Sequence, residues 1–187
     1  MNNTFIKGLL LVSLILNAVF LYMLAQQQAP APAEEVAEEI VEPVEEVLTS
    51  GESYPLMRIV DGDTMIVGFS GTTEYVRLIG IDSPEQHDPG GVECYATEAT
   101  AHMQELAQTG LVVLHFDESQ GTRDSYGRLL AYVELPDGTD LGEMMLADGY
   151  AREFTYAAAY ERQSTYKAAE ASAIENQTGL WADTACK

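Results

Sequence analysis

The pattern of hydrophobic and polar residues divides the chain into three parts, and the first is an apolar run. Residues 8–25 contain no charged side chain, and as an α-helix about 18 residues rise about 27 Å, close to the ~30 Å core of a bilayer. Lys7 precedes the run and acidic residues follow it, which favours an orientation with the C-terminal side outside. Residues 1–25 are therefore expected to be a membrane anchor or a cleaved signal segment, with the rest of the chain membrane-anchored on the extracytoplasmic side or secreted.

The second part, residues 26–50, lacks the large apolar side chains that a folded core needs. It is rich in Gln, Ala, Pro and Glu, and its like charges repel one another. We expect an acidic linker without chemistry of its own.

The third part, residues 51–187, has the pattern of a folded domain. Short β-rich runs separated by turn residues predict five strands, at 57–60, 64–69, 74–81, 111–116 and 128–135. Helical spacing predicts three helices, at 93–108, 140–149 and 160–175. Asp140 and Glu143 have the spacing of a capping box at the start of the second helix. One helix inside the strand series and two after it fit an α+β domain built on a small closed barrel of the OB type.

The charge of the chain is unusual for a protein that binds nucleic acid. There are 30 acidic residues against 9 basic ones, which gives a formal net charge of -21. This balance argues against tight nonspecific binding through a basic patch. It favours high solubility, cation-rich surroundings or bound metal ions, although most of the charge is expected to be solvated surface.

Three polar clusters interrupt the strand pattern, at residues 61–64, 77–85 and 124–128. Arg77 lies inside an apolar strand, where a charge is costly unless it has a partner or lines a cavity. Asp63 and Asp82 offer carboxylate oxygens, which hard cations such as calcium prefer. Each feature alone also has a plainer explanation, since Asp-Gly is a common turn and Arg77 could simply form a salt bridge with Asp82 or Glu85.

Together the clusters resemble the staphylococcal nuclease (thermonuclease) family. The matching segments are VDGDT (60–64), VRLIGIDSPE (76–85), DSYGRLLAYV (124–133), ADGYAR (147–152) and GLW (179–181), in the order of the family. The resemblance covers nearly all of residues 55–187 and none of residues 1–50. It implies a five-stranded OB barrel with three helices, and calcium-dependent cleavage of DNA and RNA.

The resemblance also implies a set of metal ligands. Asp63 and Asp82 match the carboxylate ligands of the calcium ion, and Ser83 matches a position that contributes its backbone carbonyl. The family commonly has Thr at that position, but since the carbonyl is the ligand, Ser should serve.

The residues that act on the substrate follow from the same resemblance. Arg77 and Arg128 match the two arginines that bind the phosphate, Glu85 matches the general base, and Tyr126 matches an aromatic residue of the nucleotide pocket. Two guanidinium groups and a divalent ion suit a transition state that gathers negative charge on phosphate oxygens. The alternative is an OB module that binds nucleic acid or protein with calcium and without catalysis, but such a module would not need Glu85. We predict no protein partner.

Cys94 and Cys186 are the two cysteines of the chain. An even number in a chain presented outside the cytoplasm suggests one disulfide, which would tie the C-terminal tail to the barrel. Two free thiols are the alternative.

Overall fold

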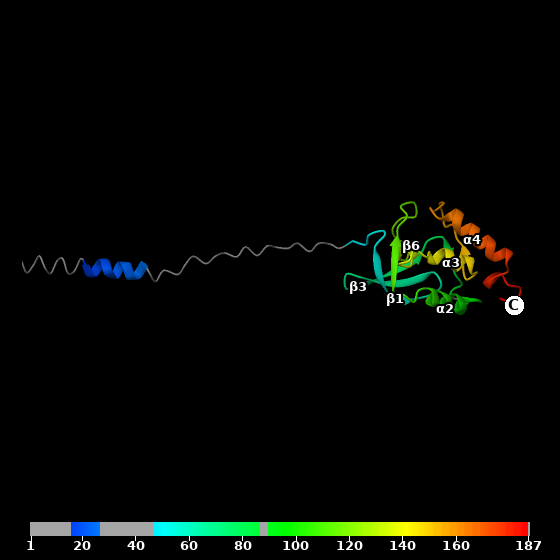
Figure 1. Cartoon of the computed structure of the whole chain (residues 1–187), viewed down its shortest axis with the longest axis horizontal. Coiled ribbons are helices and arrows are strands. Elements are labelled where there is room, and N and C mark those ends of the chain that lie inside the picture. Colours follow the sequence, from blue (N-terminus) through cyan, green and yellow to red (C-terminus); the bar gives the residue numbers. More distant parts are fainter. Residues whose placement is uncertain (1–15, 27–46, 87–89, 187) are drawn as a thin grey trace, which may run out of the picture. The chain divides into compact units, whose positions relative to one another are not determined.

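The computed structural model of the protein describes residues 16–26, 47–86 and 90–186, and the chain divides into two units, Met1–Val44 and Glu45–Lys187. In the first unit, residues 16–26 are helical, shown in blue in Figure 1. Within the described ranges, no helix combines the length and the apolar character needed to cross a membrane. Most of the predicted anchor and linker falls on residues 1–15 and 27–46, which lie outside the described residues.

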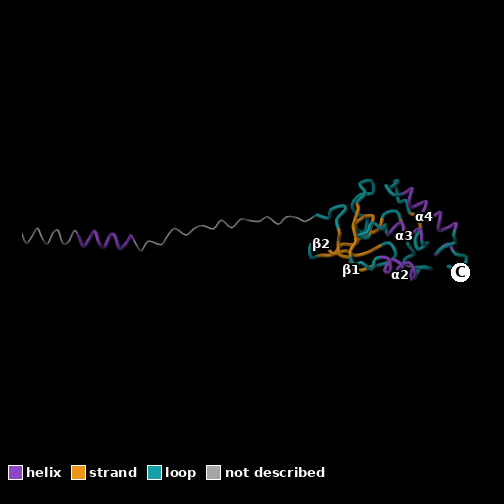
Figure 2. The backbone as a smooth tube through the Cα atoms, in the orientation of Figure 1, coloured by secondary structure: helices purple, strands orange, loops and turns teal. Residues whose placement is uncertain are grey.

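The second unit is built on a closed barrel of five strands, drawn in orange in Figure 2. The strands are β1 (Ser53–Ile59), β2 (Thr64–Phe69), β3 (Thr72–Leu78), β5 (Leu111–His115) and β6 (Leu129–Glu134), closed in the order β1-β2-β3-β6-β5. All neighbours are antiparallel except β3 and β6, which run parallel. The predicted α+β class and the five-stranded barrel are confirmed.

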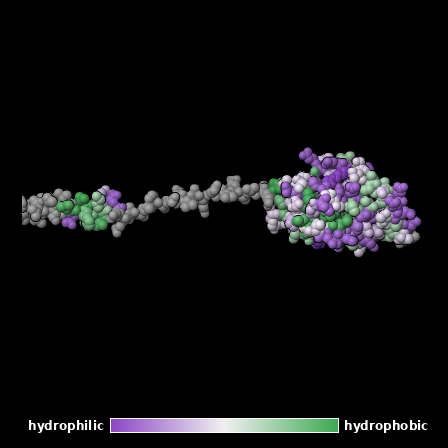
Figure 3. Space-filling model, viewed as in Figure 1, coloured by the Kyte–Doolittle hydropathy of each residue, from purple (hydrophilic) through white to green (hydrophobic). Residues whose placement is uncertain are grey.

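The inside of the barrel is filled by alternate apolar residues of its strands. Met65 and Val67 of β2, Val76 of β3, Leu114 of β5 and Val133 of β6 are all fully buried. Side chains of a strand alternate between its two faces, so every second residue of a barrel strand points into the barrel. Figure 3 shows hydrophilic residues over much of the visible face of the domain, in keeping with its charge.

Three α-helices and a short 3₁₀ helix accompany the barrel in this unit, and α4 packs against α3 (Figure 1). They are α2 (Ala96–Leu106), α3 (Leu141–Ala147), α4 (Gln163–Glu175) and η1 (Gly179–Trp181). The side chain of Asp140 accepts a hydrogen bond from the backbone of Glu143, which is the N-cap that the sequence predicts for α3. The first and third predicted helices each begin three residues later than expected.

The predicted strand at 74–81 is wrong as a single strand. The chain leaves the barrel after Leu78, and Ile81–Asp82 forms a separate strand, β4, that pairs with β7 (Arg152–Glu153). The break lies at Gly80, whose φ of 82° is left-handed, and a Cβ there would lie 2.6 Å from the ring of Tyr160. Glycine is thus required for both conformation and space, and the turn at Gly80 carries Asp82 out of the barrel strand.

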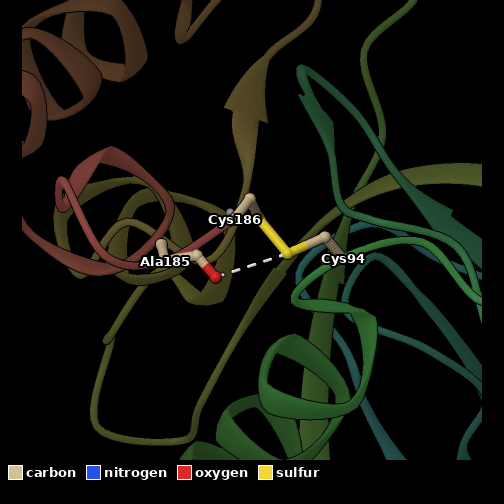
Figure 4. The surroundings of a disulfide bond; sticks show 3 residues. All are labelled: Cys94, Ala185 and Cys186. Atoms are coloured by element: carbon tan, nitrogen blue, oxygen red, sulfur yellow. Dashed lines mark hydrogen bonds between the residues drawn. A yellow bond between two sulfur atoms is a disulfide. The ribbon is translucent and has the colours of Figure 1, made fainter.

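A disulfide joins Cys94 to Cys186 across a sequence separation of 92 residues, with the two Cα atoms 5.8 Å apart. This is the pairing that the sequence suggests. Figure 4 shows the bond between the segment just before α2 and the end of the C-terminal tail.

Candidate active site

Asp63 lies at the centre of the predicted site, in the turn between β1 and β2. Its side chain is fully buried. One carboxylate oxygen accepts a hydrogen bond from the hydroxyl of Thr64 at 3.0 Å, and the other accepts one from the backbone N–H of Ser83 at 2.7 Å. Asp63 therefore joins the β1–β2 turn to the segment after β4, so two parts of the chain that are distant in sequence meet at one carboxylate.

The register of the barrel brings the two predicted arginines to the same place. Arg77 on β3 pairs with Thr64 on β2 and, on the other side, with Leu130 on β6, two residues after Arg128. The guanidinium of Arg128 donates a hydrogen bond to the Thr64 hydroxyl at 3.3 Å. Strands β2 and β3, and the turn that leads into β6, thus position Thr64, Arg77 and Arg128 as one group.

Arg77 is almost fully paired. Its Nη2 lies 3.1 Å from a carboxylate oxygen of Asp82 and 3.2 Å from one of Asp63, and its Nη1 donates to the backbone carbonyls of Leu78 and Ile81. Only 12% of its side chain is exposed, so these partners offset the cost of burying the charge. The side chain also lines a cavity, so it meets both conditions expected of a charge in an apolar strand.

The acidic group that could hold a metal differs from the predicted ligand set. Carboxylate oxygens of Asp61, Asp63 and Glu85 all lie within 4.8 Å of one another. Asp82, which the resemblance assigns to the metal, is not in this group of described residues and instead contacts Arg77. The pKa of the Asp82 carboxyl is raised by burial, an effect that the Arg77 charge opposes.

Asp61 was not among the predicted site residues, because Asp61-Gly62 has the composition of an ordinary turn. The side chain is 7% exposed, and it accepts a hydrogen bond from the backbone N–H of Asp63 at 3.1 Å. Burial, reinforced by the negative charge of Asp63, raises the pKa of Asp61 to about 7. The sequence signal that could have identified it is the pair of aspartates flanking a glycine at the end of a strand.

Glu85 lies at the edge of the same group. Burial raises the pKa of its carboxyl, and the charge of Asp63 adds to the rise, whereas the charges of Arg77 and Arg128 act in the opposite direction. Both arginines therefore lie close enough to Glu85 to influence its ionisation. This arrangement surrounds one partly buried carboxylate with two acids and two guanidinium groups.

The residues present suit a hard cation. Three crowded carboxylates carry more negative charge than Arg77 can neutralise, and all of their donor atoms are oxygens, as calcium and magnesium prefer. The hydroxyl of Ser83 is buried and has no hydrogen-bond partner in the described part of the chain. A Cβ at Gly62 would lie 2.7 Å from the Ser83 side chain, so the glycine lets the two acidic segments approach.

The turn before β6 holds Arg128 from the other side. Asp124 accepts a hydrogen bond from Nε of Arg128 at 2.7 Å, and its second oxygen accepts from the backbone N–H groups of Tyr126 and Arg128, both at 2.9 Å. The guanidinium lies 5.4 Å from the centre of the Tyr126 ring, which is itself 84% exposed. In the sequence, Asp124 is one residue of the matching segment 124–133 without a predicted role, and the structure gives it a specific contact with Arg128.

A cavity of about 350 Å³ opens beside these residues. Arg77, Arg128 and Tyr126 line it together with Phe154 and Tyr156, whose ring centres are 6.3 Å apart. The last two were not predicted, because they follow β7 and reach the cavity only through the β4–β7 pairing. A larger hollow of about 750 Å³ lies over Tyr54 and Phe69 and includes none of the acidic or arginine residues above.

Comparison with known proteins matches residues 75–183 to the family described as "Staphylococcal nuclease homologue". The chain is 38% identical over 131 residues to the SPbeta prophage-derived endonuclease YokF, and 36% identical over 131 residues to endonuclease YncB, both of Bacillus subtilis (strain 168). Each match covers 67% of this chain, but the chain spans only 43% and 60% of the lengths of those relatives. It is also 32% identical over 134 residues to the thermonuclease of Staphylococcus hyicus, covering 71% of this chain and 77% of that protein.

Proposed function

Because the chain belongs to the staphylococcal nuclease family, we propose that it is a nuclease that hydrolyses phosphodiester bonds of DNA or RNA with calcium. The observation that carries the proposal is the convergence of Arg77, Arg128 and Glu85 with the buried carboxylates of Asp61 and Asp63. The printed names of three relatives, two endonucleases and a thermonuclease, support the same reaction class.

The two arginines bind the phosphate in this proposal. Hydrolysis adds water to an anionic phosphorus centre, so negative charge builds on the phosphate oxygens in the transition state. A guanidinium presents a planar fork that matches two such oxygens at once. Arg77 and Arg128 line one cavity, and each is held by a carboxylate, so neither has to be ordered when the substrate arrives.

Glu85 is the proposed general base. A carboxylate in water is a weak base, but burial and the neighbouring Asp63 raise the pKa of Glu85 and make its oxygen more basic. A base whose pKa lies nearer the working pH takes a proton from attacking water more effectively, which contributes roughly 10² to 10⁴ fold.

Asp61 and Asp63 are the proposed carboxylates of the metal site, with Glu85 beside them. Asp82 and the carbonyl of Ser83 remain proposed ligands as well, since they belong to the segment that Asp63 binds. When bound, the ion supplies positive charge toward the phosphate and makes a nearby water more acidic. Oxygen-only donors favour a hard cation, and we propose calcium.

The exposed aromatic rings of the cavity are the proposed contacts for the nucleotide base. Tyr126 and Tyr156 are 84% and 85% exposed, and Phe154 is 44% exposed. Base–aromatic stacking contributes about 1–3 kcal/mol per base and tolerates any sequence. These rings therefore suit a substrate with unpaired bases.

We also propose that the domain works outside the reducing cytoplasm, membrane-anchored on the extracytoplasmic side or secreted. The Cys94–Cys186 disulfide supports this location, because such bonds form and persist in oxidising compartments.

The test is cleavage of single-stranded DNA and of RNA by the purified chain in calcium and in chelator. We expect cleavage only with calcium, and Glu85→Gln should lower kcat by about 10² to 10⁴ fold. Glu105→Gln, an exposed change on α2, is the matched control and should keep full activity. Calcium-dependent binding without cleavage would instead support the non-catalytic binding module. Full activity in Glu85→Gln would remove Glu85 from its role.

A further inference from the structure

Two glutamates are tied together at the edge of the acidic group. The backbone N–H of Glu85 donates a hydrogen bond to a carboxylate oxygen of Glu93 at 2.9 Å. The backbone N–H of Glu93 donates in return to the carbonyl of Glu85 at 3.0 Å. The backbone that carries Glu85 is therefore held by a residue eight positions later in the chain.

Glu93 adjoins the disulfide. Cys94 is bonded to Cys186, and its sulfur lies 3.4 Å from the carbonyl oxygen of Ala185 (Figure 4). The backbone segment that carries Glu93 is thus covalently fixed to the C-terminal tail. Without the bond, the tail would restrain this segment only through noncovalent contacts.

The tail is itself anchored to the turn that follows α3. The backbone N–H of Leu180 donates to the carbonyl of Gly149 at 2.7 Å. Gly149 and Gly179 approach so closely that a Cβ on either would lie within 2.3 Å of the other segment's backbone. The disulfide therefore links the Glu93 segment to a tightly packed part of the domain.

The segment also contains a strained residue. Tyr95 has a φ of 76°, a left-handed conformation that is costly for a bulky side chain. Its ring packs against Tyr150 with centres 5.4 Å apart, and Tyr150 stacks on His102 at 4.0 Å. Such a conformation persists only where the surroundings hold it, and the disulfide next to Tyr95 is one of the restraints.

We propose that Glu93 is a positioning residue for Glu85, and that the Cys94–Cys186 disulfide holds Glu93 in place, so that reducing the bond lowers turnover. The inference rests on the proposed nuclease function. Reduction by dithiothreitol transfers two electrons and two protons to the bond, which gives two cysteine thiols and one cyclic disulfide of the reagent. Glu93 itself does not act on the substrate in this proposal.

A disulfide that only stabilises the fold would behave differently. It would lower the melting temperature when broken but leave kcat unchanged well below that temperature. A positioning role lowers kcat in a chain that is still folded, while KM changes little, because the phosphate is bound by Arg77 and Arg128.

The experiment compares kcat and KM of wild type, Glu93→Ala, Glu93→Gln and the double variant Cys94→Ser/Cys186→Ser at 25 °C, each checked for folding by circular dichroism. Glu93→Ala, the double variant and reduced wild type should lose about 10-fold or more in kcat, with KM within about 2-fold. Glu93→Gln keeps an acceptor oxygen without the charge and should retain most of the activity. Glu98→Ala, which removes an exposed glutamate on α2, is the control for Glu93→Ala and should keep the wild-type kcat. Dithiothreitol should not change the kcat of the double variant, because that variant has no disulfide to reduce.

A second measurement does not depend on activity. Hydrogen exchange at the Glu85 amide should be slow in wild type and fast in Glu93→Ala, in the double variant and in reduced wild type. Unchanged exchange and unchanged kcat in these forms would overturn the proposal. If wild type cleaves neither DNA nor RNA but the exchange pattern is as expected, the nuclease function fails while the positioning of Glu85 stands.

Discussion

Arg128 depends on a single carboxylate for its placement. Asp124 binds Nε of Arg128 and two backbone N–H groups of the same turn. Burial acts to raise the pKa of Asp124, but the hydrogen bonds from the Arg128 side chain and backbone outweigh it and lower the pKa. The carboxylate is therefore ionised and bonded to the arginine throughout the neutral range.

We predict that Asp124→Ala lowers kcat/KM by about 10 to 100 fold. Hydrogen bonds to charged groups contribute about 1.5–3 kcal/mol, and their loss frees the guanidinium from its position beside Thr64. Steady-state kinetics on single-stranded DNA measure the effect. Asp137→Ala removes a similar turn-capping carboxylate, which accepts a hydrogen bond from the backbone N–H of Thr139, and serves as control. Equal kinetics in the two variants would contradict the role of Asp124.

Because Asp61, Asp63 and Glu85 lie close together, we predict that Asp61→Asn changes the stability of the protein in opposite directions with and without calcium. Asn at position 61 keeps an acceptor for the Asp63 backbone N–H and replaces a carboxyl whose ionisation is opposed by burial and by Asp63. In chelator, Asp61→Asn should stabilise the protein by about 1–3 kcal/mol, because a buried repulsion is relieved. In calcium it should melt below wild type, because a ligand is lost. Thermal melts of both proteins in both buffers measure this, and a variant less stable than wild type in chelator would show that the charges do not repel.

The site residues that could be predicted from the sequence are those carried by contiguous motifs. Asp63, Arg77 and Glu85 fall in such segments, and the structure brings them together. Asp61 could not be separated from an ordinary turn, because its special property is burial against two other acids. Phe154 reaches the cavity only through the pairing of β4 with β7, which no local pattern reports.

Among the elements, the break between β3 and β4 depends on Gly80. We predict that Gly80→Ala destabilises the protein by about 2–4 kcal/mol, because a left-handed alanine is strained and its Cβ would meet Tyr160 at 2.6 Å. Gly138→Ala is the matched control, with a φ of 88° and open space around the added Cβ, and should cost about 1 kcal/mol. Urea denaturation of both variants measures the difference, and equal losses would show that contact with Tyr160 does not matter.

Asp117 joins the loop after β5 to the segment before α4. It accepts hydrogen bonds from the hydroxyl of Tyr132 at 2.7 Å, from the backbone of Glu161 at 2.9 Å and from Ser119. Burial favours the neutral acid, but these bonds outweigh it and lower the pKa of Asp117 to about 2. The carboxylate therefore contributes stability above the unfolded pKa of about 4, and this contribution is lost as the pH falls toward 2.

We predict that Asp117→Asn costs about 1–3 kcal/mol at pH 7, because donors that face the carboxylate lose their charged acceptor. Between pH 4 and pH 2 the stability of wild type should fall more steeply than that of the variant, so the gap between them narrows. Urea denaturation at pH 7, 4 and 2.5 measures it, with the exposed change Glu118→Gln as control. A gap that stays constant with pH would mean that Asp117 titrates normally.

Local sequence patterns predicted which helices and strands exist better than they predicted the residues at which these elements begin and end. The Asp140 cap of α3 was predictable because capping involves residues three apart. The late start of α4 was not, since the residues before it are held by Asp117 from another part of the chain. The two-residue strands β4 and β7 are too short for a periodic pattern and exist only because they pair with each other.

For the whole molecule, the charge sets how a polyanion can bind. The chain carries 30 acidic and 9 basic residues. Arg123 contacts Glu74, and Arg162 contacts Glu134 and Asp140, so these cations are already paired with acids. Arg58, Arg152 and Lys167 are exposed cations that do not line the cavity. We therefore expect attraction for phosphate at the site to rest mainly on Arg77, Arg128 and the bound ion, although each of the two arginines also contacts a carboxylate.

This balance predicts an unusually weak salt dependence of substrate binding. Two phosphate contacts on a single strand give a slope of about -1.4 when the logarithm of the binding constant is plotted against the logarithm of the salt concentration. Salt also screens the repulsion between the acidic protein and DNA, and this second effect makes the slope shallower still. Filter binding of Glu85→Gln to single-stranded DNA at saturating calcium should therefore give a slope between about -1.4 and 0, and adding Arg128→Ala should move it toward zero by about 0.7. Binding without calcium should be weak at every salt concentration. A slope steeper than about -4, or nanomolar binding in chelator, would mean that the substrate meets a basic surface, contrary to the charges described above.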